Sequence, residues 1–94
     1  MKIPNEVKIG AHKYPITFRE MDNRCGTSES VGLKITIDST RPKSVQEETF
    51  FHEVIHIIRD LGGIANKDRD IEEQEVQIMG HGFYQFLIDN KLIK

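Results

Sequence analysis

Several features that define other classes of protein are scarce or absent in this sequence. A single cysteine, Cys25, excludes a disulfide within the chain and is typical of a protein in a reducing cytoplasm. No apolar run approaches the roughly 18 residues that a membrane-spanning helix needs, and residues 1–6 lack the apolar segment of a signal peptide. We therefore predict a cytoplasmic protein that is not embedded in a membrane.

An excess of charge of one sign is also lacking. The formal net charge is −2, the 13 basic and 15 acidic residues are interspersed, and lysine and arginine form no block. This balance argues against nucleic acid binding, which normally depends on a basic patch. The 94 residues are predicted to form one domain, residues 1–94, near the lower limit of comfortable independent folding. A core this small would gain appreciable stability from a bound metal ion.

The first part of the chain alternates polar and apolar residues, a pattern that predicts β-strands. Three strands are expected, over residues 6–10, 13–20 and 31–38. Pro15 has no N–H to donate to a neighbouring strand, so it indicates a sheet edge or a bulge. Residues 21–30 are rich in Asp, Asn, Gly, Thr and Ser and are predicted to form a loop.

The second part of the chain predicts two helices. Residues 44–61 contain no Gly or Pro, begin with a possible capping box of Ser44 and Glu47, and end before Gly62-Gly63. A second helix is expected from Asp70 to about residue 90, with Asp70 and Glu73 at capping-box spacing. The predicted fold is therefore α+β, a small three-stranded antiparallel sheet packed on two helices.

Apolar residues mark one face of each predicted helix. They are Phe50, Phe51, Val54, Ile57, Ile58 and Leu61 in the first helix, and Val76, Met79, Phe83, Phe86 and Leu87 in the second. Gly80 and Gly82 each cost roughly 1 kcal/mol in a helix interior relative to Ala. Their presence indicates either a close approach of the two helices or a break in the second.

The most informative motif is His52-Glu53-Val54-Ile55-His56. Residues four apart lie on the same face of a helix, so His52 and His56 would direct both imidazoles at one point. Glu53, next to the first histidine, could reach a water bound to a metal held there. This H-E-x-x-H arrangement predicts a zinc hydrolase site. The alternative is that two solvated histidines show this spacing by accident.

A catalytic zinc ion usually takes three protein ligands, so two histidines are not enough. Glu72, Glu73 and Glu75 of the second helix are the candidates, and periodicity does not choose cleanly among them. Glu73 is favoured because it shares a face with Gly80, where the helices could lie close together. All three carboxylates could instead be the ordinary negative charge of a helix N-terminus.

The expected chemistry is peptide hydrolysis. Zinc would lower the pKa of a bound water, and Glu53 would accept its proton and deliver it to the leaving amine. Tyr84 is the predicted donor to the developing oxyanion, although a tyrosine of the core is an equal alternative. If the strand over residues 31–38 forms the sheet edge, it could pair with an extended peptide substrate.

Other potential ligands are assigned lesser roles. His12 is predicted to lie on the surface in a turn. His81 could be a fourth ligand or a transition-state donor, but a solvated side chain is the favoured interpretation. Cys25 is predicted to be a small buried residue, because the Cys25-Gly26 pair has no partner cysteine.

The chain resembles the zincin metallopeptidases, and among them small phage- or prophage-encoded proteins related to the ImmA/IrrE group. The resemblance is carried by Cys25-Gly26, Ile35-Thr36-Ile37, the segment from Glu48 to His56, and the segment from Glu73 to Gln85. It implies zinc, peptide hydrolysis, Glu73 as the third ligand, and a repressor or regulatory protein of phage or host as substrate.

Two functions are therefore expected. The first is a zinc-dependent endopeptidase of narrow specificity, with His52, His56 and Glu73 as ligands, Glu53 as general base and a polypeptide as substrate. The second is a non-catalytic phage protein that keeps zinc for structure and acts by binding another protein. The sequence leaves the oligomeric state open.

Overall fold

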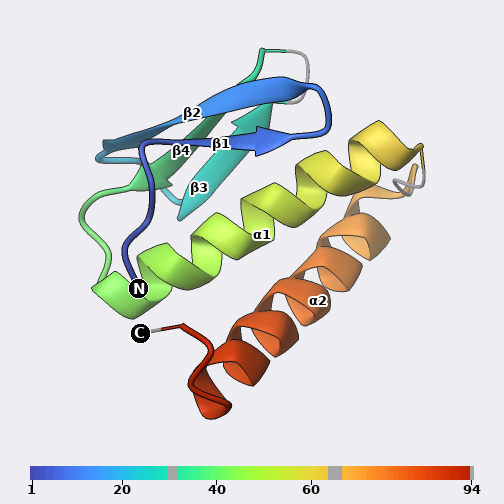
Figure 1. Cartoon of the computed structure of the whole chain (residues 1–94). Coiled ribbons are helices and arrows are strands. Elements are labelled where there is room, and N and C mark those ends of the chain that lie inside the picture. Colours follow the sequence, from blue (N-terminus) through green and yellow to red (C-terminus); the bar gives the residue numbers. More distant parts are fainter. Residues whose placement is uncertain (30–31, 64–66, 94) are drawn as a thin grey trace.

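Four strands precede two long helices in the computed structural model, which describes residues 1–29, 32–63 and 67–93. The elements are β1 (Glu6–Ile9), β2 (His12–Arg19), β3 (Gly26–Glu29), β4 (Lys34–Asp38), α1 (Lys43–Gly62) and α2 (Arg69–Asp89). The strands form one sheet in the order β1-β2-β4-β3. In Figure 1, α1 lies between the sheet and α2. Among the described elements, α2 packs on α1 and on no strand.

The sheet is mixed and four-stranded, so the prediction of a three-stranded antiparallel sheet was wrong. β1 and β2 are antiparallel, β2 and β4 are parallel, and β3 and β4 are antiparallel. The additional strand is β3, whose sequence Gly-Thr-Ser-Glu lies in the segment predicted to be a loop. This strand has no apolar alternation, and it is a strand because its backbone pairs with β4.

The insertion of β3 changes which strand lies at the sheet edge. The chain crosses to the far edge as β3 and returns as β4, which therefore runs beside β2 and parallel to it. The strand predicted over residues 31–38 is thus internal, and the edge next to α1 is β3. The start predicted for that strand, at residue 31, and the end predicted for the loop, at residue 30, lie outside the described residues.

The core lies between the sheet and α1. Its buried apolar residues are Ile3, Ile9, Tyr14, Ile16, Ile35, Ile37, Phe50 and Ile57. The predicted inner face of α1 is confirmed at Phe50 and Ile57, whereas Ile58 and Leu61 are about half exposed. The stripe predicted for α2 contributes buried Val76, but Met79, Phe83 and Phe86 are each about half exposed because α2 has only α1 as a neighbour.

The ends of the helices differ from the predicted capping boxes. Pro42 occupies the N-cap of α1 without a side-chain hydrogen bond, and Gly63 ends the helix at φ 71°, where its N–H donates to carbonyls of the last turn. The N-cap of α2 is Asp68, whose carboxylate accepts from the N–H groups of Asp70 and Ile71. Glu73 is therefore not needed as a capping partner and can point toward α1.

Asp38 fixes the turn that connects β4 to α1. Its buried carboxylate accepts hydrogen bonds from the N–H of Thr40 at 2.9 Å, the hydroxyl of Thr40 at 2.7 Å and Nε of Arg41 at 3.1 Å. The hydroxyl of Thr40 is the main reason that the pKa of Asp38 lies below its usual value. These bonds set the direction in which α1 leaves the sheet, and hence where its histidines lie.

The two helices make their closest approach at Gly80. A Cβ atom at this position would lie 3.2 Å from Cα and 3.4 Å from N of His52, whereas a Cβ atom at Gly82 would have no neighbour within 4 Å. Helix α2 is continuous through both glycines, so the alternative of a break is excluded. Gly80 thus allows α2 to lie directly against the first histidine of the motif.

We expect opposite effects on stability from alanine at the two glycines. Gly82→Ala should raise the free energy of unfolding by up to about 1 kcal/mol, because alanine favours the helix and meets nothing. Gly80→Ala should lower it by about 1–3 kcal/mol, because the methyl group forces the helices apart. Urea unfolding of both variants measures the difference, and an equal gain at both positions would show that the helices are not in close contact there.

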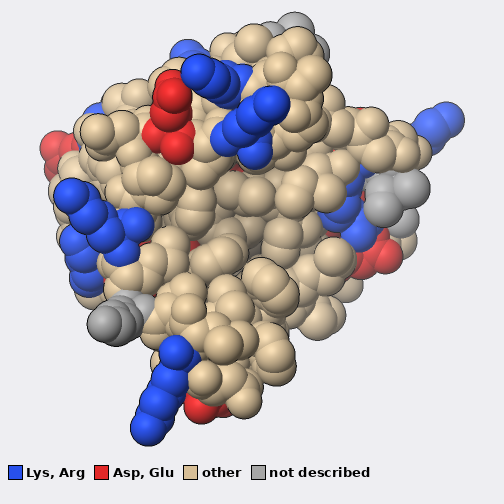
Figure 2. All heavy atoms as spheres, in the orientation of Figure 1, with Lys and Arg blue, Asp and Glu red and all other residues tan. Residues whose placement is uncertain are grey.

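Neither helix within residues 43–62 and 69–89 is long and apolar enough to cross a membrane. On the face of the molecule shown in Figure 2, basic and acidic side chains lie mostly around the margin and much of the middle carries neither. This face does not present the continuous basic surface typical of nucleic acid binding.

Candidate metal centre

His52 and His56 lie on the side of α1 that faces α2, and each lines a cavity that β3 also borders. Their rings are one helical turn apart, with centroids separated by 4.9 Å. Both side chains are mostly buried, with 14% and 18% exposed. The spacing in the sequence therefore brings the two imidazoles together, as helix geometry requires.

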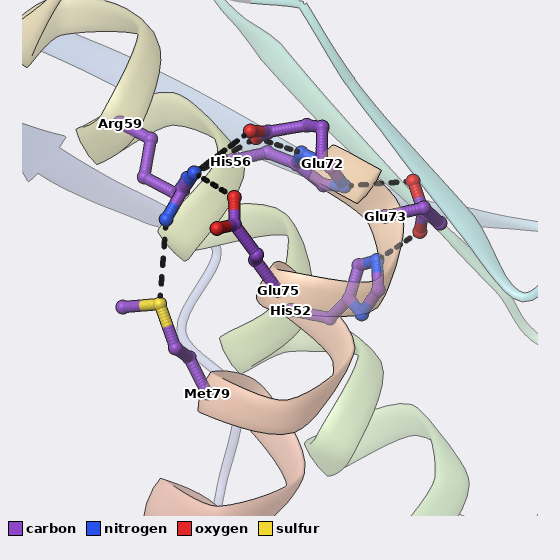
Figure 3. A network of polar contacts seen from close by, with 7 residues as sticks. All are labelled: His52, His56, Arg59, Glu72, Glu73, Glu75 and Met79. Atoms are coloured by element: carbon purple, nitrogen blue, oxygen red, sulfur yellow. Dashed lines mark hydrogen bonds and ion pairs between the residues drawn. The ribbon is translucent and has the colours of Figure 1, made fainter. Parts of the chain in front are cut away.

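The carboxylate of Glu73 reaches both imidazoles from α2. Its Oε1 lies 2.6 Å from Nε2 of His52, and its Oε2 lies 3.2 Å from Nε2 of His56. Figure 3 shows the carboxylate directed at the two rings. The potential ligand atoms of the three residues all lie within 4.8 Å of one another. Residues from two helices, 17 positions apart at their closest, thus converge on one point.

This donor set fits a zinc ion. Two imidazole nitrogens and one carboxylate oxygen are ligands that zinc prefers, with bonds of about 2.0–2.2 Å and ligand atoms roughly 3.4 Å apart around a tetrahedron. The two separations between Glu73 and the imidazoles, 2.6 Å and 3.2 Å, are both shorter than this value, so small side-chain rotations that move the groups apart would accommodate the ion. The side chain of Glu73 is 58% exposed, which leaves the centre open on one side. An open position is the mark of a catalytic rather than a structural zinc site.

Glu53 lies beside this centre and is buried, with 6% of its surface exposed. Burial is the main effect on its carboxyl group and raises its pKa, while a hydrogen bond with Ser28 and the neighbouring imidazoles act in the opposite direction. Ser28 belongs to β3, so the edge strand holds the position of this carboxylate. A buried, oriented carboxylate next to two potential metal ligands has the placement expected of a general base.

Gly26 explains how β3 comes so close to α1. A Cβ atom at this position would lie 2.6 Å from Cγ2 of Thr49 and 2.8 Å from the carbonyl oxygen of Thr36. Any side chain would therefore push the strand away from the helix. The absence of one allows Ser28, two residues further along, to reach Glu53.

A buried arginine pairs with the acidic residues that neighbour Glu73 on α2. Arg59 is 9% exposed and donates to both carboxylate oxygens of Glu72, at 3.0–3.2 Å, and to Glu75 at 2.6 Å. Its other terminal nitrogen lies 3.6 Å from the sulfur of Met79 (Figure 3). The carboxylates, Glu72 first, raise the pKa of Arg59. The bidentate ion pair between Arg59 and Glu72 fixes the rotation of α2 relative to α1.

Of the three candidate acids of α2, Glu72 and Glu75 both pair with Arg59, whereas Glu73 contacts the histidines. Glu73 contacts both imidazoles, and Glu75 contacts Arg59. Glu72 pairs with Arg59, and its Oε2 also lies 3.5 Å from Nδ1 of His56. A carboxylate behind a ligating imidazole commonly orients the ring and fixes its tautomer. The geometry therefore places Glu73 at the centre and Glu72 behind it.

Tyr84 is not brought together with the histidines. Its hydroxyl donates to Glu47 at 2.9 Å, and burial together with this carboxylate raises the pKa of Tyr84 to about 12. It lines neither of the two cavities beside Glu53. The role predicted for Tyr84 as an oxyanion donor therefore gains no support from its position.

The remaining histidines and the cysteine also stand outside the three-residue cluster. His12 is exposed at the start of β2, and His81 is exposed with its Nδ1 2.9 Å from Glu48. Cys25 is half-buried and lines the smaller cavity, of about 280 Å³, together with His52 and Glu53.

An open cleft of about 820 Å³ leads to the centre. It is lined by β3 and the preceding residues, by Glu53, His56 and Asp60 of α1, and by the first turn of α2. The cleft and the smaller cavity share Glu53 and Glu73. A cleft of this size can hold several residues of an extended peptide next to the two carboxylates.

Two residues of the site were missed by the sequence analysis. Ser28 lies on a strand that periodicity did not predict, and no local signal marks it. Arg59 follows His56 by three positions, so helical spacing alone places it on the same side of α1. Its acidic partner, however, lies on another helix and has no signature in the sequence.

No family model matches the chain, and neither a curated protein nor a solved structure was found to be similar to it. The resemblance to zincin metallopeptidases therefore rests on the motif residues themselves, and the class of this site is argued from its geometry.

Proposed function

We propose that this protein is a zinc-dependent endopeptidase, with His52, His56 and Glu73 as metal ligands and Glu53 as general base. The observation that carries the proposal is the convergence of both imidazole Nε2 atoms on the carboxylate of Glu73. The carboxylate comes from a different helix and bridges the two imidazoles, which brings three potential zinc ligands together. Buried Glu53 beside this cluster adds the group that hydrolysis needs.

Bound zinc would supply polarisation of the scissile carbonyl and activation of a water molecule. Residues of the chain transfer the proton and position the ligands. Glu53, held by Ser28, accepts the proton of the attacking water and delivers it to the leaving amine. Glu72 and Arg59 hold the ring of His56 in place.

The substrate in this proposal is a polypeptide in extended conformation. Strand β3 is the edge of the sheet, and all four of its residues line the cleft. An edge strand can hydrogen-bond to an extended peptide through its free backbone groups, which requires no particular side chains. Peptide pairing was expected for the strand over residues 31–38, but β4 is internal, so we assign this pairing to β3. From the resemblance, we propose a regulatory protein of phage or host as the target, in the cytoplasm.

One observation favours the second function, a non-catalytic binding protein that keeps zinc for structure. Helix α2 exposes a row of large apolar side chains, namely Ile78, Met79, Phe83 and Phe86, with exposed fractions of 47–73%. Exposed apolar rows of this kind commonly mark protein-binding surfaces. A structural site would, however, close around the ion with four protein ligands, and only three potential ligands converge in the described residues.

Metal content and cleavage test the proposal together. Protein purified without added zinc should contain about one zinc ion per chain and should cleave a pool of proteome-derived peptides. A chelator should stop cleavage, and added zinc should restore it. Full zinc occupancy without any cleavage, with four protein ligands by X-ray absorption, would instead establish the binding protein.

A further inference from the structure

The arginines of this chain divide into two groups according to their partners. Arg41 and Arg59 form ion pairs with buried carboxylates. The other three, Arg19, Arg24 and Arg69, form no ion pair within the described residues, and all three line the cleft that leads to Glu53. No described lysine lines this cleft. Every Lys or Arg side chain at the cleft that lacks an ion pair to a described residue is thus an arginine.

Three of the five acidic residues that line the cleft contact basic side chains. Glu29 lies 3.4 Å from a lysine of β4, Glu72 is held by Arg59, and Glu73 contacts the two imidazoles. Asp60 is the one remaining carboxylate of the lining, apart from Glu53, that has no ion pair in the described part of the chain. The cleft therefore presents three arginines and two carboxylates, Glu53 and Asp60, that have no ion pair within the described residues, although the net charge of the chain is −2.

The three arginines come from three separate parts of the fold. Arg19 ends β2, Arg24 precedes β3 by two residues, and Arg69 is the first residue of α2. Arg24 lines both the cleft and the smaller cavity, as do Gly26, Glu53 and Glu73. A guanidinium group offers a planar, two-pronged arrangement of donors that matches a carboxylate.

We propose that the cleft selects acidic peptides, and that Arg19, Arg24 and Arg69 bind Asp or Glu side chains that flank the scissile bond. The position of the acidic side chains beside a scissile bond rests on the proposed peptidase function. The binding of acidic peptides by the arginines does not depend on it. Arg24 carries the largest share because it borders both cavities. Backbone pairing with β3 then holds any peptide, while the arginines choose among sequences.

Cleavage of proteome-derived peptides by the zinc-loaded protein gives the first test. We expect Asp and Glu to be enriched at the positions flanking the cleaved bonds. Binding gives the second test, with Glu53→Gln as a non-hydrolysing background and two random ten-residue peptide pools as probes. One pool is rich in Asp and Glu, and the other replaces them with Asn and Gln. The acidic pool should bind about tenfold more tightly, and salt should reduce the difference.

Substitution of the arginines tests whether the preference for acidic peptides depends on the cleft. Arg24→Gln should reduce the preference for the acidic pool, and the triple change Arg19→Gln, Arg24→Gln and Arg69→Gln should abolish it. The matched control replaces Lys2, Lys8 and Lys91, which are exposed and do not line the cleft, by Gln. This control changes the net charge by the same amount and should keep the full preference.

The outcomes separate this inference from the proposed function. Cleavage without acidic enrichment would overturn the inference and leave the peptidase intact. An arginine-dependent preference for the acidic pool without cleavage would support the inference and refute the peptidase. An equal loss in the lysine control would mean that only overall charge matters, which overturns the inference. Binding of a single-stranded oligonucleotide as tightly as the acidic pool would also overturn it.

Discussion

Replacement of Glu53 by glutamine should reduce peptide cleavage by about 10²–10⁴-fold, the range that a general base contributes. The amide has nearly the same shape as the carboxyl group, so it can fill the buried position between α1 and Ser28. It cannot accept a proton from water. Zinc content should stay near that of the parent, because Glu53 is not one of the three residues whose ligand atoms converge.

Cleavage of the peptide pool and metal analysis of the same preparation measure the two halves of this prediction. Glu6→Gln, an exposed change at the start of β1, serves as the control and should retain both activity and zinc. Loss of zinc from the Glu53 variant would show that this residue is a ligand or a structural support. Unchanged cleavage would remove Glu53 from the mechanism and with it the proposed chemistry.

Replacement of Glu73 by alanine should weaken zinc binding by more than about 100-fold, beyond the loss typical for a residue that only supports a ligand. The reason is geometric, because this carboxylate is the group that reaches both imidazoles, at 2.6 Å and 3.2 Å. The metal-free protein should be little affected, since the side chain of Glu73 is more than half exposed. Competition with a chelator measures the affinity, and thermal unfolding with and without zinc measures its effect on stability.

Glu75→Ala is the matched control for Glu73→Ala. Glu75 lies two residues further along the same helix and is also exposed, but it contacts Arg59 rather than the histidines. It should keep nearly all of the zinc affinity. Glu72→Ala should fall between the two, because Glu72 lies behind His56 and its loss leaves Arg59 without its buried partner. Equal losses at all three positions would refute the assignment of Glu73.

The variants Glu53→Gln and Glu73→Ala also distinguish an endopeptidase from a binding protein with a structural metal. In an endopeptidase, Glu53→Gln separates activity from zinc binding, whereas Glu73→Ala removes both. In a binding protein with a structural metal, Glu53→Gln would have no functional effect, and Glu73→Ala would act only through stability. The exposed apolar side chains of α2 would then be the surface to mutate for partner binding.

The histidine pair shows what local sequence can predict. Four-residue spacing on a helix without Gly or Pro is enough to bring His52 and His56 together, because the geometry of an α-helix is the same in every fold. The end of α1 at Gly63 was predictable for the same reason, since the left-handed conformation favours glycine. The assignment of Glu73 rested on weaker evidence, namely a helix face that it shares with Gly80, about two turns further along. The close approach of Gly80 to His52 agrees with that argument.

Strand β3 shows where local sequence fails. Gly-Thr-Ser-Glu has a low intrinsic preference for a strand, and only its pairing with β4 and the contact of Gly26 with α1 make it one. The sheet order follows from this strand, so the predicted topology was wrong as a consequence of one missed element. Ser28 and the cleft could not be predicted for the same reason.

The sequence by itself determined the two helices and the pair of imidazoles on one side of α1, because each depends on interactions between residues a few positions apart. Only the tertiary structure decided which acid meets those imidazoles, which strand borders the cleft, and that its walls carry three arginines with no ion pair in the described part of the chain. These features join residues that are distant in the chain, and their contacts form only when the packing of α1 against the sheet and α2 has fixed every backbone in place.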